Sequence, residues 1–167
     1  KGLLIGLVGV FILLSFQFRS YSEPLIVMVS IPMALIGVIL GHLIMGQNLA
    51  MPSIIGFISL AGIVVNNAIL LVEFVKHHVS EGMDLHQAAR QASQDRMRAI
   101  LLTTMTTVAG MLPLLMETSL QAQVLIPLVI SISFGLLVST LLILIVLPCL
   151  YTVLQDFKSK PAAVESQ

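Results

Sequence analysis

The sequence predicts an all-α membrane protein whose chain crosses the lipid bilayer five times. Its 167 residues are 57% hydrophobic and only 10% charged, whereas soluble domains carry about 25% charged residues. Five apolar runs are nearly free of ionisable side chains, and each is long enough for a helix that crosses the hydrocarbon layer, which needs about 20 residues. The mean hydropathy of +1.06 agrees with this fold class.

The five spans are expected at about 2–18, 24–45, 51–75, 99–116 and 124–154. The short connectors 19–23 and 46–50 require the spans on either side of them to run antiparallel. Pro32 lies inside the second run and predicts a kink, which membrane bundles tolerate because neighbouring groups satisfy the freed carbonyl.

The connector between the third and fourth spans carries its own helical pattern over 84–95. Asp84 is followed three residues later by Gln87, an acidic variant of the capping box. Ala88, Ala89 and Ala92 then share one face. The pattern predicts a short amphipathic cytoplasmic helix on the membrane surface, and a solvated connector helix fits it equally well. We expect the tail 157–167 to be disordered.

Lysine and arginine predict the orientation of the chain. With five spans, the connectors 19–23 and 76–98 and the tail lie on one side, which is cytoplasmic by the positive-inside rule. The N-terminus is then periplasmic and the C-terminus cytoplasmic. The basic residues on the cytoplasmic side are Arg19, Lys76, Arg90, Arg96, Arg98, Lys158 and Lys160.

Composition restricts the classes of partner that this chain is expected to bind. Eight basic and eight acidic residues balance, so no net charge points to nucleic acid, and lipid is the expected surrounding. The single cysteine, Cys149, excludes an internal disulfide. No pattern calls for a cofactor or a metal, and His77-His78 is interpreted as a solvated pair. The chain begins inside an apolar run without methionine, so we expect it to belong to a longer protein.

Small residues predict where helices approach one another closely. The second span contains Gly37-x-x-x-Gly41, and the fifth repeats small residues every four positions. Glycines on the third and fourth spans extend the set. The predicted packing residues are Gly37, Gly41, Gly62, Gly110, Ser131, Gly135 and Ser139.

Two stripes of polar side chains lie within the apolar spans. Ser59, Gly62, Asn66 and Glu73 follow near-heptad spacing on the third span, with Asn67 beside them. The fourth span carries a matching stripe of Arg96, Thr103, Thr106, Thr107 and Gly110. Antiparallel packing would bring Asn66 and Thr103 to similar depth. The stripes are either a hydrated transport path or interhelical hydrogen-bond glue, which contributes about 0.6 kcal/mol per contact.

No Asp, Glu, Lys, Arg or His lies at the centre of any predicted span. Asparagine and threonine do not change charge near neutral pH, and a proton-driven cycle needs a group that does so within the membrane. Any such acid would therefore come from another part of the parent protein.

Two sequence blocks identify a family resemblance. Residues 62–74, Gly-Ile-Val-Val-Asn-Asn-Ala-Ile-Leu-Leu-Val-Glu-Phe, resemble the signature span of resistance-nodulation-division (RND) transporters. Residues 96–104 followed by 110–114 resemble the next span of that family. The similarity runs from about Leu4 to Asp156, with the AcrB-type inner-membrane pumps as the nearest group.

The resemblance implies that the chain is the last five of twelve spans of a proton-driven multidrug antiporter in a Gram-negative inner membrane. It implies that the chain packs with the N-terminal half and the periplasmic domains of the same pump, and that this pump is a homotrimer. It also implies a periplasmic adaptor and an outer-membrane channel as partners. It also implies a proton relay in which Thr103 and Arg96 take part and Asn67 follows the relay lysine. The fragment alone would be inactive.

The position of the relay lysine is Asn66 in this chain. A lysine can exchange ion-pair partners, whereas asparagine offers only neutral hydrogen bonds, so the coupling ion and its stoichiometry stay open. The alternative function is a structural membrane anchor or trimerisation module of a non-efflux member of the superfamily. In that case the polar stripes would be packing seams.

Overall fold

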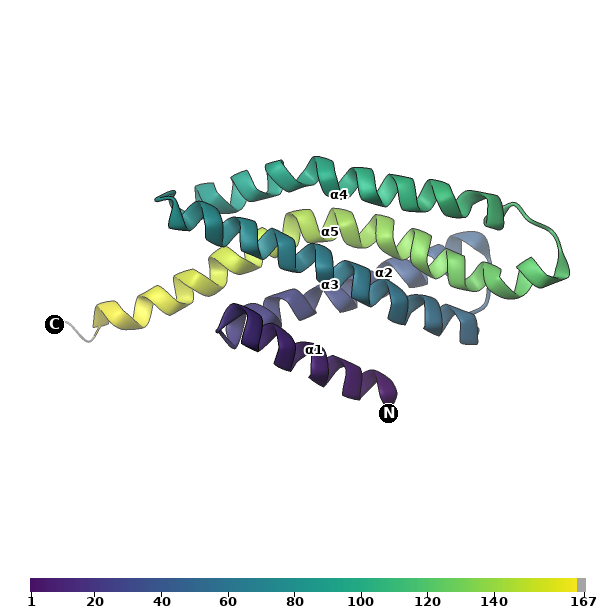
Figure 1. Ribbon diagram of the computed structural model, residues 1–167, viewed down its shortest axis with the longest axis horizontal. Helices are drawn as coiled ribbons and strands as arrows, with labels where there is room; N and C mark the ends of the chain where they lie inside the picture. Colours follow the sequence, from purple (N-terminus) through teal and green to yellow (C-terminus); the bar gives the residue numbers. More distant parts are fainter. Residues whose placement is uncertain (165–167) are drawn as a thin grey trace.

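The structure, a computed structural model, describes the backbone of residues 1–164 and the side chains of residues 1–158. The described residues form five helices and no strand, which confirms the predicted fold class (Figure 1). The helices are α1 (Gly2–Phe18), α2 (Ser22–Met45), α3 (Met51–Ser80), α4 (Leu85–Leu115) and α5 (Leu120–Val164).

Four of these helices, α2 to α5, are long and apolar enough to cross a membrane, and α1 is a shorter apolar helix. Successive helices reverse direction, so the α1–α2 and α3–α4 connections lie at the left of Figure 1 and the α2–α3 and α4–α5 connections at the right. We call the first the basic end, because Arg19, Lys76 and Arg96 lie there, and the second the far end.

The centre of the bundle is α5, which packs against α2, α3 and α4. Leu136, Ile143 and Leu147 of α5 are almost completely buried, together with Leu60 and Leu71 of α3. The shorter α1 lies at the edge of the bundle, where it packs against α2 (Figure 1).

The predicted surface helix over 84–95 is not a separate element. It is the first part of α4, which runs unbroken from Leu85 to Leu115, because no glycine or proline interrupts residues 85–109. Ala88, Ala89 and Ala92 are buried in the protein core, so this face packs against protein and not on a lipid surface. Asp84 is the N-cap residue, but its side chain makes no capping hydrogen bond.

Two other boundaries differ from the sequence prediction. α3 continues to Ser80, about a turn beyond the predicted span. α5 continues to Val164, so residues 157–164 of the predicted disordered tail are helical, and residues 165–167 lie outside the described residues.

Three of the predicted packing glycines hold α2 and α5 together. A Cβ atom placed on Gly37 would lie 2.8 Å from the Gly135 Cα and 2.9 Å from the Phe134 carbonyl oxygen. A Cβ on Gly41 would overlap Phe134, and one on Gly135 would overlap Leu60 of α3. The two helices can therefore approach this closely only because one of them carries a glycine at each contact.

The other packing residues divide into buried and open positions. Ser131 and Ser139 of α5 are buried. Around Gly62 and Gly110, by contrast, a Cβ would meet no atom of this chain within 4 Å. The sequence analysis missed Gly56, whose Cβ would lie 2.7 Å from the Leu128 carbonyl oxygen at the α3–α5 contact.

Candidate functional site

The threonines of α4 differ in burial. Thr104 is buried, and its hydroxyl lies 2.9 Å from that of Thr140 on α5. Thr103 and Thr106 are exposed, and each donates to a carbonyl of its own helix, as Thr103 does to Ala99 at 2.9 Å. Thr107 donates to the Thr103 carbonyl in the same way. One face of α4 is thus joined to α5, while the threonine stripe faces away from this chain.

The two predicted asparagines of α3 also differ in exposure. Asn66 is exposed, and Asn67 is buried with about a tenth of its surface accessible (9%). Gly62 and Ser59, about one and two turns earlier on the same stripe, are exposed as well. The α3 stripe is therefore open over about two turns of the helix.

Arg96 and Phe74 fix the relative depth of the two stripes. The Arg96 guanidinium carbon lies 3.7 Å from the centre of the Phe74 ring, so α4 and α3 meet at this level. Asn67 is seven residues before Phe74, and Thr103 is seven residues after Arg96. In antiparallel helices both positions lie about 10 Å from the contact, because an α-helix rises 1.5 Å per residue. The predicted match in depth is therefore compatible with the observed packing.

Arg96 lies at the basic end of this open face. Its side chain is partly buried, and its Nε atom is buried without a hydrogen-bond partner among the described residues. Stacking on Phe74 compensates part of the desolvation of the cation. The exposed side chains Asn66 and Thr103, the buried Asn67 and the partly buried Arg96 define what we call the open polar face.

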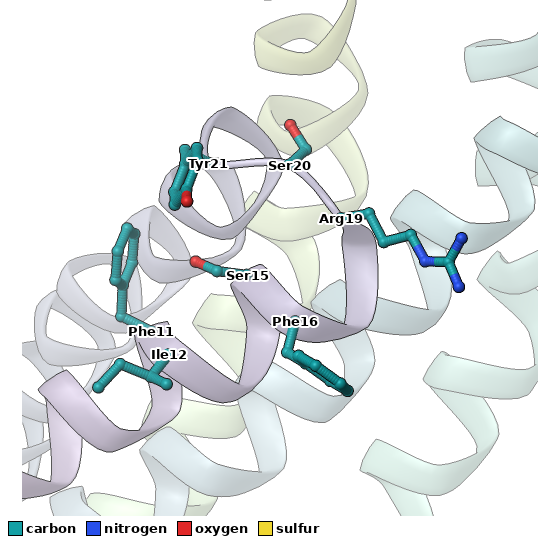
Figure 2. A pocket seen from close by; sticks show the side chains of 7 residues that line it. All are labelled: Phe11, Ile12, Ser15, Phe16, Arg19, Ser20 and Tyr21. Atoms are coloured by element: carbon teal, nitrogen blue, oxygen red, sulfur yellow. The ribbon is translucent and has the colours of Figure 1, made fainter.

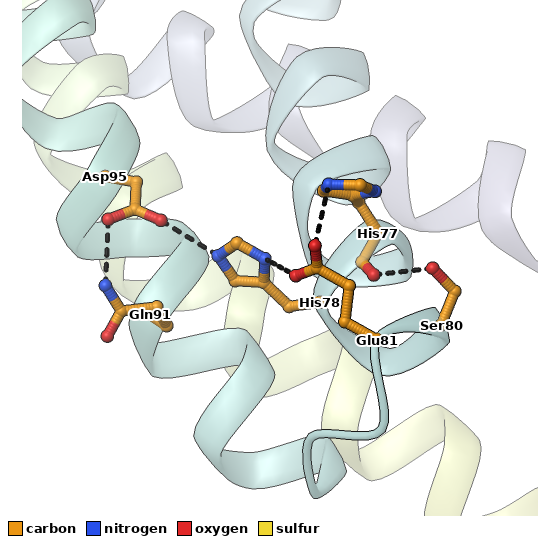
Figure 3. Close-up of polar contacts among 6 residues, drawn as sticks. All are labelled: His77, His78, Ser80, Glu81, Gln91 and Asp95. Carbon is orange, nitrogen blue, oxygen red and sulfur yellow. Dashed lines mark hydrogen bonds and ion pairs between the residues drawn. The ribbon is translucent and has the colours of Figure 1, made fainter.

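A cluster of charged side chains closes the α3–α4 hairpin at the basic end (Figure 3). His78 Nε2 lies 2.8 Å from Asp95 Oδ2, and Gln91 Nε2 donates to Asp95 Oδ1 at 2.9 Å. The hydrogen bond from His78, then that from Gln91, lowers the pKa of the Asp95 carboxyl. His78 is therefore a paired residue, and the sequence prediction of a solvated pair fits only His77, which is exposed.

A second charged pair joins α2 and α3. Lys76 Nζ lies 3.0 Å from Glu23 Oε2, and the Glu23 side chain is buried. The same ammonium group lies 5.3 Å from the Phe18 ring of α1, and Gln17 donates to Glu73 Oε1 at 3.3 Å. Sequence reasoning missed this group because its members are 53 and 56 residues apart.

The far end holds a neutral polar cluster that was also missed. His42 Nδ1 lies 2.9 Å from the Val38 carbonyl, so this nitrogen donates, and His42 Nε2 lies 2.8 Å from Ser53 Oγ. Ser131 Oγ in turn donates to the Ser53 carbonyl at 3.1 Å. His42, Ser53 and Ser131 are all buried, so the cluster ties α2, α3 and α5 together.

A groove of about 440 Å³ lies where α1 turns into α2 (Figure 2). Phe11, Ser15 and Tyr21 face one another, while the Arg19 guanidinium points away from them. Arg19 adopts the left-handed backbone conformation, with φ of 51°. Among the described residues, no group of three His, Cys, Asp or Glu side chains is placed to hold a metal ion.

Five antiparallel helices with a polar face open at membrane depth are typical of the membrane part of a transporter. The profile of the AcrB/AcrD/AcrF family matches residues 3–155. The chain therefore belongs to this family of RND transporters, which confirms the resemblance that its two sequence blocks indicated.

Individual relatives agree with this assignment. The chain is 33% identical to the swarming motility protein SwrC of Bacillus subtilis over 95% of its length, and 35% identical to the cobalt-zinc-cadmium resistance protein CzcA of Cupriavidus metallidurans over 88%. It is 34% identical to the multidrug resistance protein MdtC of Erwinia amylovora over 95%. The crystal structure of a heavy metal efflux pump superposes on 92% of the chain with a TM-score of 0.81 and 28% identity.

The chain spans only a small part of these proteins. It covers 15% of SwrC, 14% of CzcA, 16% of MdtC and 16% of the heavy metal efflux pump. It is accordingly an RND-family membrane segment. The activities and substrates in the names of these relatives belong to those whole proteins.

Proposed function

We propose that this chain is part of the membrane domain of a proton-driven efflux pump, and that its open polar face lines the proton path. The observation that carries the proposal is the exposure of Asn66 and Thr103 inside helices long enough to span a membrane. Polar groups at this depth face protein or water and not lipid. Another segment of the parent protein therefore covers them.

The covering segment supplies the charge that changes during the cycle. Asn66, Asn67 and Thr103 offer only neutral donors and acceptors, so carboxylates on the opposite surface would take up and lose the proton. Arg96 has a buried nitrogen without a partner, and it would form an ion pair with such a carboxylate at the basic end. Because Asn66 replaces the lysine of related pumps, this relay would work with acids, hydroxyl groups and water.

The assembly and placement of the pump follow the same proposal. Its basic end lies in the cytoplasm, with the N-terminus of this chain in the periplasm, in the inner membrane of a Gram-negative cell. The intact protein is a homotrimer that works with a periplasmic adaptor and an outer-membrane channel. The names of its relatives include both metal and multidrug resistance, so either substrate class fits. The chain alone moves no protons.

A pair of threonine variants tests the role of the open face. Thr103→Val removes a hydroxyl from this face, and Thr104→Val removes one from the α4–α5 contact. In the native full-length protein, we expect Thr103→Val to abolish proton-coupled efflux at unchanged thermal stability. Thr104→Val should lower stability slightly and keep coupling. Proton flux is followed in proteoliposomes with a pH-sensitive dye.

Unchanged proton-coupled efflux in Thr103→Val would remove the open face from the proton path. Folded trimers with no proton flux in the wild-type protein would instead support the structural anchor as the function of this segment. Proton flux through the isolated 167-residue chain would contradict the need for a covering segment.

A further inference from the structure

His78 is held in one orientation by a carboxylate, as Figure 3 shows. Asp95 Oδ2 can only accept a hydrogen bond, so the nitrogen 2.8 Å away, His78 Nε2, carries the proton. In the neutral ring the other nitrogen, Nδ1, then has the free lone pair. Gln91 fixes the second oxygen of Asp95, so the carboxylate itself cannot turn.

The free nitrogen of His78 lies in a protected position next to an exposed acid. Nδ1 is buried and has no hydrogen-bond partner among the described residues. The nearest carboxylate oxygen is Glu81 Oε2 at 3.6 Å, which is beyond hydrogen-bond distance. The Glu81 side chain is 53% exposed, whereas that of His78 is 12% exposed. A small rotation of Glu81 would therefore connect the buried nitrogen to solvent.

The His78 imidazole is separated from Arg96, at the end of the open polar face, by one aromatic ring. The rings of His78 and Phe74 meet in a T-shaped arrangement, with centroids 6.3 Å apart, and Arg96 stacks on the face of Phe74. The charged and titratable groups around His78 are Asp95 and Arg96 from α4 and Glu81 and His77 from α3.

We propose that His78, oriented by Asp95, transfers protons between the basic end of the open polar face and the solvent. This inference rests on the proposed function. Imidazole is the side chain whose charge changes closest to neutral pH, and a carboxylate on its far nitrogen stabilises the imidazolium. A proton that arrives near Arg96 binds Nδ1. It then passes to the Glu81 carboxylate and to water, and His78 returns to its neutral Nε2–H form.

The neighbouring histidines lack this arrangement. His77 is 64% exposed and lies 3.4 Å from Glu81 alone. His86 is 66% exposed and lies 3.7 Å from Asp156. Neither has an imidazole nitrogen within 3 Å of a carboxylate, so only His78 combines a fixed tautomer with a shielded basic nitrogen among these three residues.

The test compares His78→Gln with His77→Gln in the native full-length protein in proteoliposomes. Glutamine can still donate to Asp95, so the hairpin should stay folded. We expect His78→Gln to slow proton-coupled transport about tenfold or more, as for loss of a general acid–base group. His78→Gln should also change how the rate depends on the pH of the basic-end side, and His77→Gln should keep the wild-type profile.

A second variant separates proton transfer from structure. His78→Ala should be slow and should recover part of its rate when free imidazole is added, which a purely structural role would not produce. The inference is overturned if His78→Gln keeps the wild-type rate and pH profile while Thr103→Val still uncouples the pump. If the wild-type protein moves no protons at all, the proposed function itself has failed.

Discussion

α4 and α5 are neighbouring helices that both carry hydroxyl side chains but differ in how much of each is buried inside this chain. In their most apolar windows, 56% of α5 is buried inside this chain but only 11% of α4. The hydroxyl groups of Ser131 and Ser139 lie inside the bundle, whereas those of Thr103 and Thr106 lie outside it. α5 therefore completes its packing within the chain, while α4 presents half of an interface that another segment must cover.

The largest difference should appear when a side chain is added to a glycine of each region. Gly37→Leu would force α2 away from the Gly135 backbone of α5. We expect the free energy of unfolding to fall by at least about 3 kcal/mol, since overpacking costs 1–3 kcal/mol or more. A Cβ on Gly110 of α4 would meet no atom within 4 Å, so Gly110→Leu should leave the chain folded. Thermal unfolding in detergent measures both, and equal losses would contradict the packing contrast.

A smaller loss of folding stability is expected when a buried charge is left without its partner. Lys76→Met leaves the buried Glu23 carboxylate unpaired. A fully buried pair would cost 3–5 kcal/mol, and we expect about 2 kcal/mol, because the Lys76 side chain is 39% exposed. Arg98→Met on the exposed side of α4 is the control and should have little effect. Denaturant titration of the two variants gives the difference.

The far-end cluster should be more sensitive to the loss of a hydroxyl than the open face. Ser53→Ala removes the partner of His42 Nε2 and of the Ala50 N–H, and we expect about 1–2 kcal/mol of destabilisation for the groups left unpaired. Thr106→Val removes a hydroxyl that bonds only its own helix, and its stability should be unchanged. A similar loss in both variants would mean that the hydroxyl of the open face also supports the fold.

The two faces of α4 can be compared directly at adjacent residues. Thr104→Val breaks the hydrogen bond with Thr140. We expect it to lower the free energy of unfolding by about 0.6 kcal/mol, the average for interhelical hydrogen bonds in membranes. Thr103→Val should cost less than this. The unfolding midpoints of the two variants, measured side by side, show which substitution costs more stability. A larger cost for Thr103→Val would contradict the packing of the Thr104 side of α4 against α5.

The smallest effect concerns the pH dependence of the α3–α4 hairpin. The pKa of Asp95 is lowered in the folded protein from its ordinary 3.8, so its contribution to stability is present above that value and is lost as the pH falls through the folded pKa. Asp95→Asn should therefore flatten the loss of stability as the pH falls below the ordinary carboxyl pKa of 3.8. Asp84→Asn, on an exposed N-cap without a capping bond, should not change it.

Local sequence patterns predicted the elements because each of them depends on residues close together in the chain. The apolar run of α1 was placed at 2–18, where the helix lies, and Gly37 and Gly41 were recognised from their spacing on one helix. The pattern over 84–95 correctly predicted a helix. The prediction that this helix is separate from the next span was wrong, because α4 continues to Leu115. The change from polar to apolar composition near residue 98 indicated a boundary, although residues 85–109 contain no glycine or proline that would end the helix.

The candidate site shows the limit of this reasoning. Asn66 and Thr103 could be named from their stripes, and the His78–Asp95 and Lys76–Glu23 pairs could not, because each joins residues on different helices. A histidine next to another histidine carries no sign of the carboxylate that will face it across a hairpin.

The sequence by itself determined that this is a membrane segment of five apolar helices, because the length and polarity of each apolar run follow directly from the order of its residues, and the resemblance of residues 62–74 and 96–114 indicated the RND family. Only the tertiary structure decided which polar side chains are buried and which stay open. That choice depends on the side of each helix that meets α5, and it is set by where the helices can approach closely. Gly37 and Gly135 permit such contact for α2 and α5. On α4, Thr104 faces Thr140 of α5, and Thr103 and Thr106 are left exposed.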